Sequence, residues 1–162
     1  MLTNLDILMS RLRDAEYVYL LLEPLPLFGL FFGLIFFAIG LHMAEERCRM
    51  TALVVITASC ASTIPYAKYR DQAMPRVLQT AEITRVPGIK KQTELRDETR
   101  WVYYLVGGFG LAALVGGGKL GTWSHTVMLM GGVIAVIFSI WLHMKEAEVY
   151  HPNIKKSILR RR

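Results

Sequence analysis

Four apolar blocks separated by charged segments run along the chain and predict four membrane-spanning helices. The blocks cover residues 25–43, 50–69, 101–118 and 125–144. The first of them, LPLFGLFFGLIFFAIGLHM, has 19 residues and no charged side chain. At 1.5 Å rise per residue it is roughly 29 Å long, which matches the hydrocarbon core of a bilayer. In a chain of this size, a helix that is apolar on every side indicates contact with lipid.

An amphipathic surface helix is predicted over residues 4–22, ahead of the first span. Its apolar side chains recur at helical spacing, and charged side chains occupy the opposite face. The apolar positions are Leu5, Leu8, Met9 and Leu12. Pro24 and Pro26 are expected to interrupt this helix, because proline lacks the backbone N–H that a continuous helix needs. The expected class is therefore an all-α integral membrane protein, a four-helix bundle with an N-terminal surface helix.

One sizeable extramembrane segment is expected, an inner loop at residues 70–100. Pro75 is expected to start a short helix in it, and Pro87-Gly88 to form a turn. The charged run at residues 90–100, KKQTELRDETR, is predicted to continue as a water-exposed helix into the third span.

The second apolar block is rich in small and hydroxylated residues, which predicts that this helix packs against neighbouring helices. Pro65 is expected to kink it near its end. Cys48 and Cys60 would lie about 18 Å apart on a continuous helix. That separation is too long for a disulfide, so both are predicted to be free thiols.

Lysine and arginine are unevenly distributed about the predicted spans, in a chain of formal net charge +6. If the N-terminus is inside, 16 of the 19 basic residues lie on the inner side, and only Arg47, Arg49 and Lys119 lie outside. Cytoplasmic segments of membrane proteins carry such an excess. Both termini are therefore predicted inside, with a basic tail at residues 145–162. The expected location is a bacterial inner membrane, as a single multi-pass domain of residues 1–162; the alternative is the mitochondrial inner membrane.

Two histidines are candidate cofactor ligands on the predicted outer side. His42 ends the first span and His125 begins the fourth. On neighbouring helices they would suit a haem b iron or a quinol. The simpler interpretation, which we favour, is that both side chains lie at the membrane interface among water and headgroups.

Glu23 and His143 form a second candidate site, on the predicted inner side. Glu23 is the only acid in the apolar stretch of residues 17–43, and His143 or Lys145 is its expected partner. Ionisable groups at a membrane edge are typical of proton or quinone sites. The alternative, which we favour, is that Glu23 extends to the surface or caps a local turn.

Two further features predict contacts rather than chemistry. Helix packing is expected at four glycines, the spaced pair Gly29 and Gly33 and, in the third span, Gly107 and Gly110. The tail is expected to bind anionic lipid headgroups or an acidic partner through Lys155, Lys156, Arg160, Arg161 and Arg162. Its charges flank a span without a recognition motif, so nucleic-acid binding is not expected.

Three segments carry a resemblance to a bacterial family of uncharacterised four-helix inner-membrane proteins. Residues 23–28, EPLPLF, resemble a degenerate form of the His-Pro…His-Phe-Pro opening of that family. Residues 61–71, ASTIPYAKYRD, are similar to the end of its second helix, and residues 148–151, EVYH, to its closing Leu-Val-Tyr…His. Glu23 stands where the first histidine would be. The resemblance therefore implies the four-helix architecture but carries over no ligand.

Motifs for catalysis are missing from the sequence: it has no Walker A loop, HExxH, paired CxxC or nucleophile elbow. Small size and close-packing helices favour a non-catalytic accessory subunit of a larger membrane complex, of the respiratory or photosynthetic kind. Its expected partners are lipids and other membrane subunits, with no cofactor of its own. The alternative is a small cytochrome b or quinone-site protein. A transporter component is a weaker option, because the spans offer no polar pathway.

Overall fold

The computed structural model describes residue 6 and residues 9–116 and 121–150, and this part of the chain is all-helical. Seven labelled helices follow one another. They are α2 (Ala15–Leu22), α3 (Leu25–His42), α4 (Glu46–Ala61), α5 (Thr63–Thr80), α6 (Val86–Thr99), α7 (Trp101–Gly116) and α8 (Gly121–Tyr150). The all-α class predicted from the sequence is confirmed for these residues.

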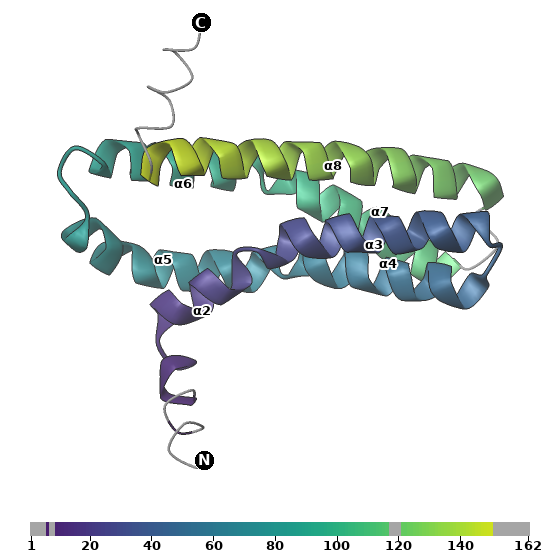
Figure 1. Cartoon of the computed structure of the whole chain (residues 1–162), viewed down its shortest axis with the longest axis horizontal. Coiled ribbons are helices and arrows are strands. Elements are labelled where there is room, and N and C mark those ends of the chain that lie inside the picture. The colour runs from purple at the N-terminus through teal and green to yellow at the C-terminus, as the bar shows by residue number, and fades with distance from the viewer. Residues whose placement is uncertain (1–5, 7–8, 117–120, 151–162) are drawn as a thin grey trace, which may run out of the picture.

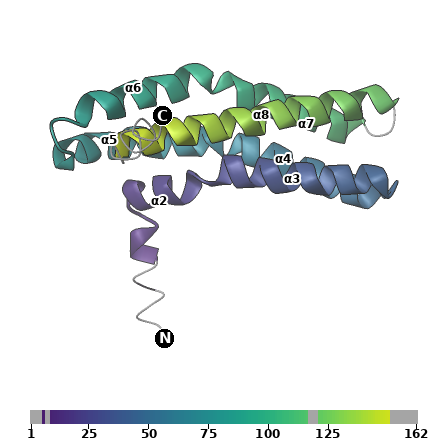
Figure 2. The ribbon, with the colours of Figure 1, turned by 45° about the horizontal axis from the view of Figure 1, so that its top comes forward.

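The helices form an elongated molecule with two unlike ends (Figure 1). At one end α3, α4, α7 and the first part of α8 pack together, and we call this part the bundle. At the other end α2 packs on α5, and α6 packs on the last part of α8. We call this second part the polar end. With 30 residues, about 45 Å, α8 runs through both parts (Figures 1 and 2).

Three helical stretches are long and apolar enough to cross a membrane: Ala15–His42, Glu46–Thr80 and Ser124–Tyr150. The first contains the elbow between α2 and α3, where Pro24 precedes α3 and Pro26 lies in its first turn. The outer face of α3 exposes a row of phenylalanines, which suits contact with acyl chains. These are Phe28, Phe31, Phe32 and Phe36.

The predicted surface helix at residues 4–22 is wrong as a continuous element. The chain turns at residues 12–14, and Asp14 then caps a new helix, α2. The Asp14 backbone is extended, and its Oδ1 accepts a hydrogen bond of 3.0 Å from the Glu16 N–H. An aspartate in this position favours a helix start over helix continuation.

Helices occupy the predicted second span and most of the predicted inner loop, with ends that differ from the expected ones. The helix of the second span ends at Ala61, and a new helix, α5, begins at Thr63. Pro65 therefore lies in the first turn of α5, where a backbone N–H has no partner within the helix, so proline costs no hydrogen bond there. Residues 70–100 are mostly helical, with one connection at 81–85.

Two prolines in that segment do not have the predicted effect. Pro75 lies inside α5 rather than at the start of a helix, and Pro87 lies in the first turn of α6 rather than in a turn with Gly88. Gly88 faces α8, where an added Cβ would lie 3.0 Å from Val149 Cγ1. The expected helical extension of the third span is present, because α6 runs to Thr99 and α7 begins at Trp101.

The core of the bundle is filled by apolar side chains from all four of its helices. Phe37 and Leu30 of α3, Ile56 of α4 and Ala135 of α8 have no exposed surface. The two cysteines are free thiols, as predicted, and Cys60 is buried in this core.

Glycines set how closely α3 and α7 approach α4. A Cβ at Gly29 would lie 1.8 Å from Ser59 Oγ, and one at Gly33 would lie 2.6 Å from Ile56 Cγ1. In α7, a Cβ at Gly107 would lie 2.9 Å from Cys60 Cβ, and one at Gly110 would lie 2.7 Å from Thr57 Oγ1. All four glycines singled out in the sequence therefore face α4, the central helix of the bundle. In lipid, such close approach stabilises helix pairs through van der Waals contact.

Gly29→Ala is expected to lower the free energy of unfolding by about 1–3 kcal/mol, because the new methyl group overlaps Ser59. Thermal unfolding in detergent measures the change. Gly108→Ala is the matched control: no described atom lies within 4 Å of the new Cβ, so it should be neutral or slightly stabilising. Adding Ser59→Gly to Gly29→Ala should restore part of the loss. Equal effects of the two alanine substitutions would contradict the packing account.

Candidate functional site

An arginine at the polar end joins four segments of the chain. Arg96 of α6 donates through Nη1 to the Tyr66 hydroxyl of α5 at 2.6 Å. Through Nη2 it donates to Glu23 Oε1, at the α2–α3 elbow, at 3.4 Å, and also to Glu146 Oε2 of α8. The side chains of Arg96, Glu23 and Glu146 are 12%, 21% and 17% exposed, so these charges are largely shielded from water. Such buried ionic contacts are strong only while every member is present.

A second arginine links α5 to α6. Arg70 has a side chain that is only 3% exposed, and its Nη2 donates to Asp97 Oδ1 at 2.7 Å and to Asp71 Oδ1 at 2.9 Å. Arg100 also pairs with Asp97. Burial raises the pKa of Asp97, but the hydrogen bonds and attraction from Arg70 and then Arg100 together outweigh it. The pKa of this carboxyl group therefore lies below its usual value, and Asp97 is an anion that holds both arginines.

A small, partly open cavity of about 30 Å³ lies among these groups. Glu23, Tyr66, Arg70, Tyr103 and His143 are among the side chains that line it. The Nε atoms of Arg70 and of Arg96, which also lines the cavity, are buried and have no hydrogen-bond partner among the described residues. A polar cavity of this size accommodates one or two water molecules, which would accept from such donors.

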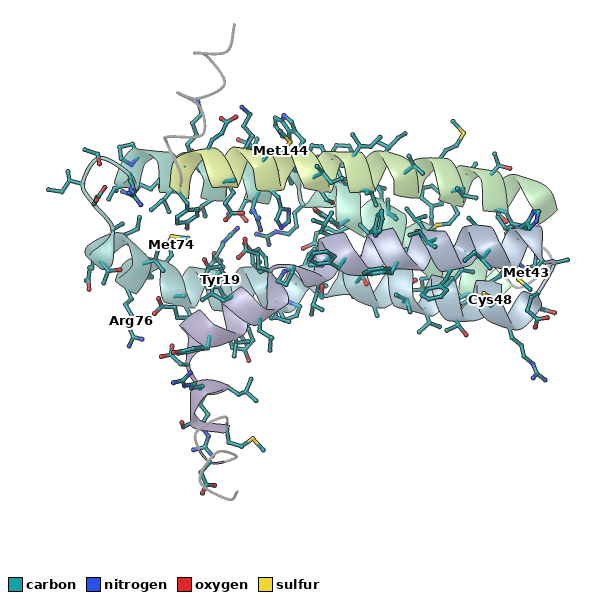
Figure 3. The ribbon with its side chains drawn as sticks, in the orientation of Figure 1. Tyr19, Met43, Cys48, Met74, Arg76 and Met144 are labelled. Carbon is teal, nitrogen blue, oxygen red and sulfur yellow. The ribbon has the colours of Figure 1, made fainter. Side chains whose placement is uncertain are left out.

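A wider groove of about 490 Å³ adjoins the cavity and is open to the outside. It lies between α2, α5 and the end of α8. Glu23 and His143 line the groove as well as the cavity, and Glu146 and Tyr150 complete its α8 wall. Tyr19 of α2 also lines it and is found near the centre of Figure 3. The volume is within the range of sites that bind small molecules.

Polar groups continue from this site into the bundle. His143 Nδ1 lies 2.9 Å from the Ser139 carbonyl oxygen. One turn deeper, the Ser139 and Tyr103 hydroxyls are 2.7 Å apart, and Ser139 has no exposed surface. Because a carbonyl only accepts, His143 Nδ1 donates the proton of this bond. The site therefore reaches beyond the arginines toward the middle of α7 and α8.

The structure brings Glu23 and His143 to one cavity, but of the two expected partners Lys145 is not bonded to Glu23. Glu23 bonds to Arg96, whereas Lys145 pairs with Glu148 at 3.2 Å. Glu23 is the C-cap residue of α2, and its backbone N–H donates to the Tyr19 carbonyl oxygen, while its side chain lies in a largely buried ionic cluster. The sequence does not distinguish Arg96 as a site residue, because it is one of seven charged residues in the run at 90–100.

The histidine pair predicted on the outer side lies where α3 ends and α8 begins, at the opposite end of the molecule, which Met43 and Cys48 mark in Figure 3. His42 is the exposed last residue of α3, and the His125 ring packs edge-on against Phe37, with 5.9 Å between ring centroids. No hydrogen bond or ring contact among the described residues joins His42 to His125. Within the described part of the chain, no group of three or more His, Cys, Asp or Glu side chains is arranged to hold a metal ion. A haem at His42 and His125 stays a prediction.

The predicted lipid- or partner-binding tail lies outside the described residues. This applies to Lys155, Lys156, Arg160, Arg161 and Arg162. The first residues of the predicted tail, 145–150, belong to α8, and Tyr150 at the end of this helix lines the groove. Binding by these residues stays a prediction.

Arg96→Gln is expected to lower the free energy of unfolding by about 3–5 kcal/mol, because it leaves two shielded carboxyl groups without their guanidinium. Arg76→Gln is the matched control. Arg76 is 64% exposed, points away from the bundle (Figure 3) and pairs with Asp14 and Glu16 near the surface. Its loss should change stability by about 0–1 kcal/mol. Denaturant unfolding of both variants in detergent measures the difference, and similar values would refute the special role of Arg96.

No family model, curated protein or solved structure matches this chain. The resemblance to the bacterial four-helix family therefore stays a prediction, based on residues 23–28, 61–71 and 148–151. The geometry of the polar end and of the bundle is the basis on which a function has to be argued.

Proposed function

We propose that the chain crosses a bacterial inner membrane four times and serves as a non-catalytic subunit of a larger membrane complex, of the electron-transfer kind. The fourth crossing would be α7. Its 16 described residues are apolar and span about 24 Å, and it packs on α4 and α8, which both belong to stretches long enough to cross. The exposed Trp101 at its start suits an anchor at headgroup level.

The proposed orientation places the polar end inside the cell. The chain reverses between α3 and α4 at residues 43–45, at the far end of the bundle, whereas α2, α5, α6 and the end of α8 all lie at the polar end. Eight lysines and arginines fall within residues 68–100 alone. The excess of cations typical of cytoplasmic segments supports this orientation.

The subunit role is supported most by the rigid extension that α5, α6 and the end of α8 build beyond the bundle. Arg70 and Arg96 fix these helices to one another, so the extension is ordered before any partner binds. A pre-ordered surface loses less conformational entropy on association than a loop would. Its exposed cations suit an acidic partner surface. They are Lys68, Arg76, Lys90 and Lys91.

The groove at the polar end favours a second function, a quinone-binding subunit. Glu23 and His143 lie in one groove of about 490 Å³, beside the exposed apolar side chain of Leu20. A quinone headgroup would find hydrogen-bonding groups there, and its apolar chain could extend past α2 into lipid. This candidate uses the residues that the sequence predicted for a proton or quinone site.

The subunit role predicts that the chain, tagged and extracted from its native membrane in mild detergent, has the native mass of a larger assembly with a partner in fixed stoichiometry. Mass measurement of the intact assembly and identification of its chains provide the test. The charge reversal Lys90→Glu with Lys91→Glu should lower the assembled fraction. Arg47→Glu, an equally exposed reversal at the opposite end, should not. Recovery of the wild-type chain only as a free monomer would contradict the proposal.

The same preparation distinguishes the second function. Organic extraction of the purified chain should yield about one quinone per chain if the groove binds it, and Glu23→Gln should reduce that amount. A stoichiometric assembly without bound quinone would support the subunit role and contradict the quinone-binding function.

A further inference from the structure

We propose that Glu23 and Glu146 share one bound proton, which makes the polar end a proton-binding site between the first span and α8. This site is independent of whether the chain is a subunit of a larger complex. Glu23 lies at the elbow between α2 and α3, and Glu146 lies near the end of α8.

Both carboxyl groups bond to the same nitrogen, Nη2 of Arg96, so their oxygens are close neighbours. Two carboxylates in contact at a site shielded from water repel each other, and such pairs hold one proton between them. A single guanidinium neutralises only one of the two.

The balance of charge around the pair also favours one bound proton. The other titratable groups near it, from all helices packed there, are Glu16 and Tyr19 of α2, Tyr66 and Arg70 of α5, Arg100 of α6, Tyr103 of α7, and His143 and Tyr150 of α8. Arg70 and Arg100 are bound to Asp97, and Glu16 faces Arg76. Arg96 is thus the only guanidinium bonded to the pair among the described residues. The pair with Arg96 carries one excess negative charge unless it binds a proton.

A buried arginine lines the cavity beside the pair. Arg70, with its side chain 97% buried, has an unpartnered Nε and lines the same cavity as Glu23. A cavity of about 30 Å³ beside such a donor suits water, which would hydrogen-bond to the Glu23 carboxyl group. The open groove on the other side is lined by both glutamates and connects them to the surroundings. A proton therefore has a route to the pair.

Infrared spectroscopy of the full-length protein in lipid vesicles tests the proposal, because protonated and ionised carboxyl groups absorb at different frequencies. At pH 6 a free glutamate is only about 2% protonated. The wild-type chain should retain one protonated carboxyl group there. Glu23→Gln and Glu146→Gln should each abolish that signal.

Glu148→Gln is the matched control, since Glu148 lies two residues from Glu146 and pairs with Lys145 instead. It should leave the signal intact. Three outcomes would overturn the proposal: no protonated carboxyl group in the wild type at pH 6, survival of the signal in both Glu23→Gln and Glu146→Gln, or its loss in Glu148→Gln. The wild-type measurement decides the first of these even if a variant does not fold.

Discussion

The contact between Arg96 and its three partners is the interaction on which the arrangement of the polar end depends. Its guanidinium reaches the first elbow, α5 and α8 from α6, four segments that are far apart in the sequence. Charges shielded to this degree lose most of their hydration, and only mutual pairing offsets that loss. Removing the guanidinium would leave the carboxyl groups shielded and unpaired. The helices beyond the bundle are therefore held in place by a specific ionic cluster together with a small apolar cluster of Tyr19, Tyr66 and Ala73.

The bundle is stabilised differently, by close contact of backbones. Glycines of α3 and α7 meet Ser59, Ile56, Cys60 and Thr57 on α4, which makes α4 the shared partner. In lipid, water does not drive helices together, so such contacts supply much of the stabilisation. The long helix α8 joins these two parts (Figure 2).

Much of the fold was predictable because composition and spacing are local properties. Three of the four apolar blocks lie in helical stretches long and apolar enough to cross a membrane, and Gly29 and Gly33 indicated close packing. Residues 70–100 were predicted poorly because Pro75 and Pro87 were expected to mark helix starts and turns, whereas tertiary contacts of α5 and α6 stabilise continuous helices there. The pairing of Glu23 with Arg96 spans 73 residues of sequence, and no local pattern distinguishes Arg96 from its charged neighbours.

The most direct test of this account is hydrogen exchange, followed by mass spectrometry, of the protein in lipid nanodiscs. If the ionic cluster fixes the polar end to the bundle, backbone amides in the interiors of α5 and α6 should exchange far more slowly than in an unstructured chain, with protection approaching that of α4. Exchange of these amides at the rate of an unstructured chain would contradict the account, since residues 70–100 would then be a loop.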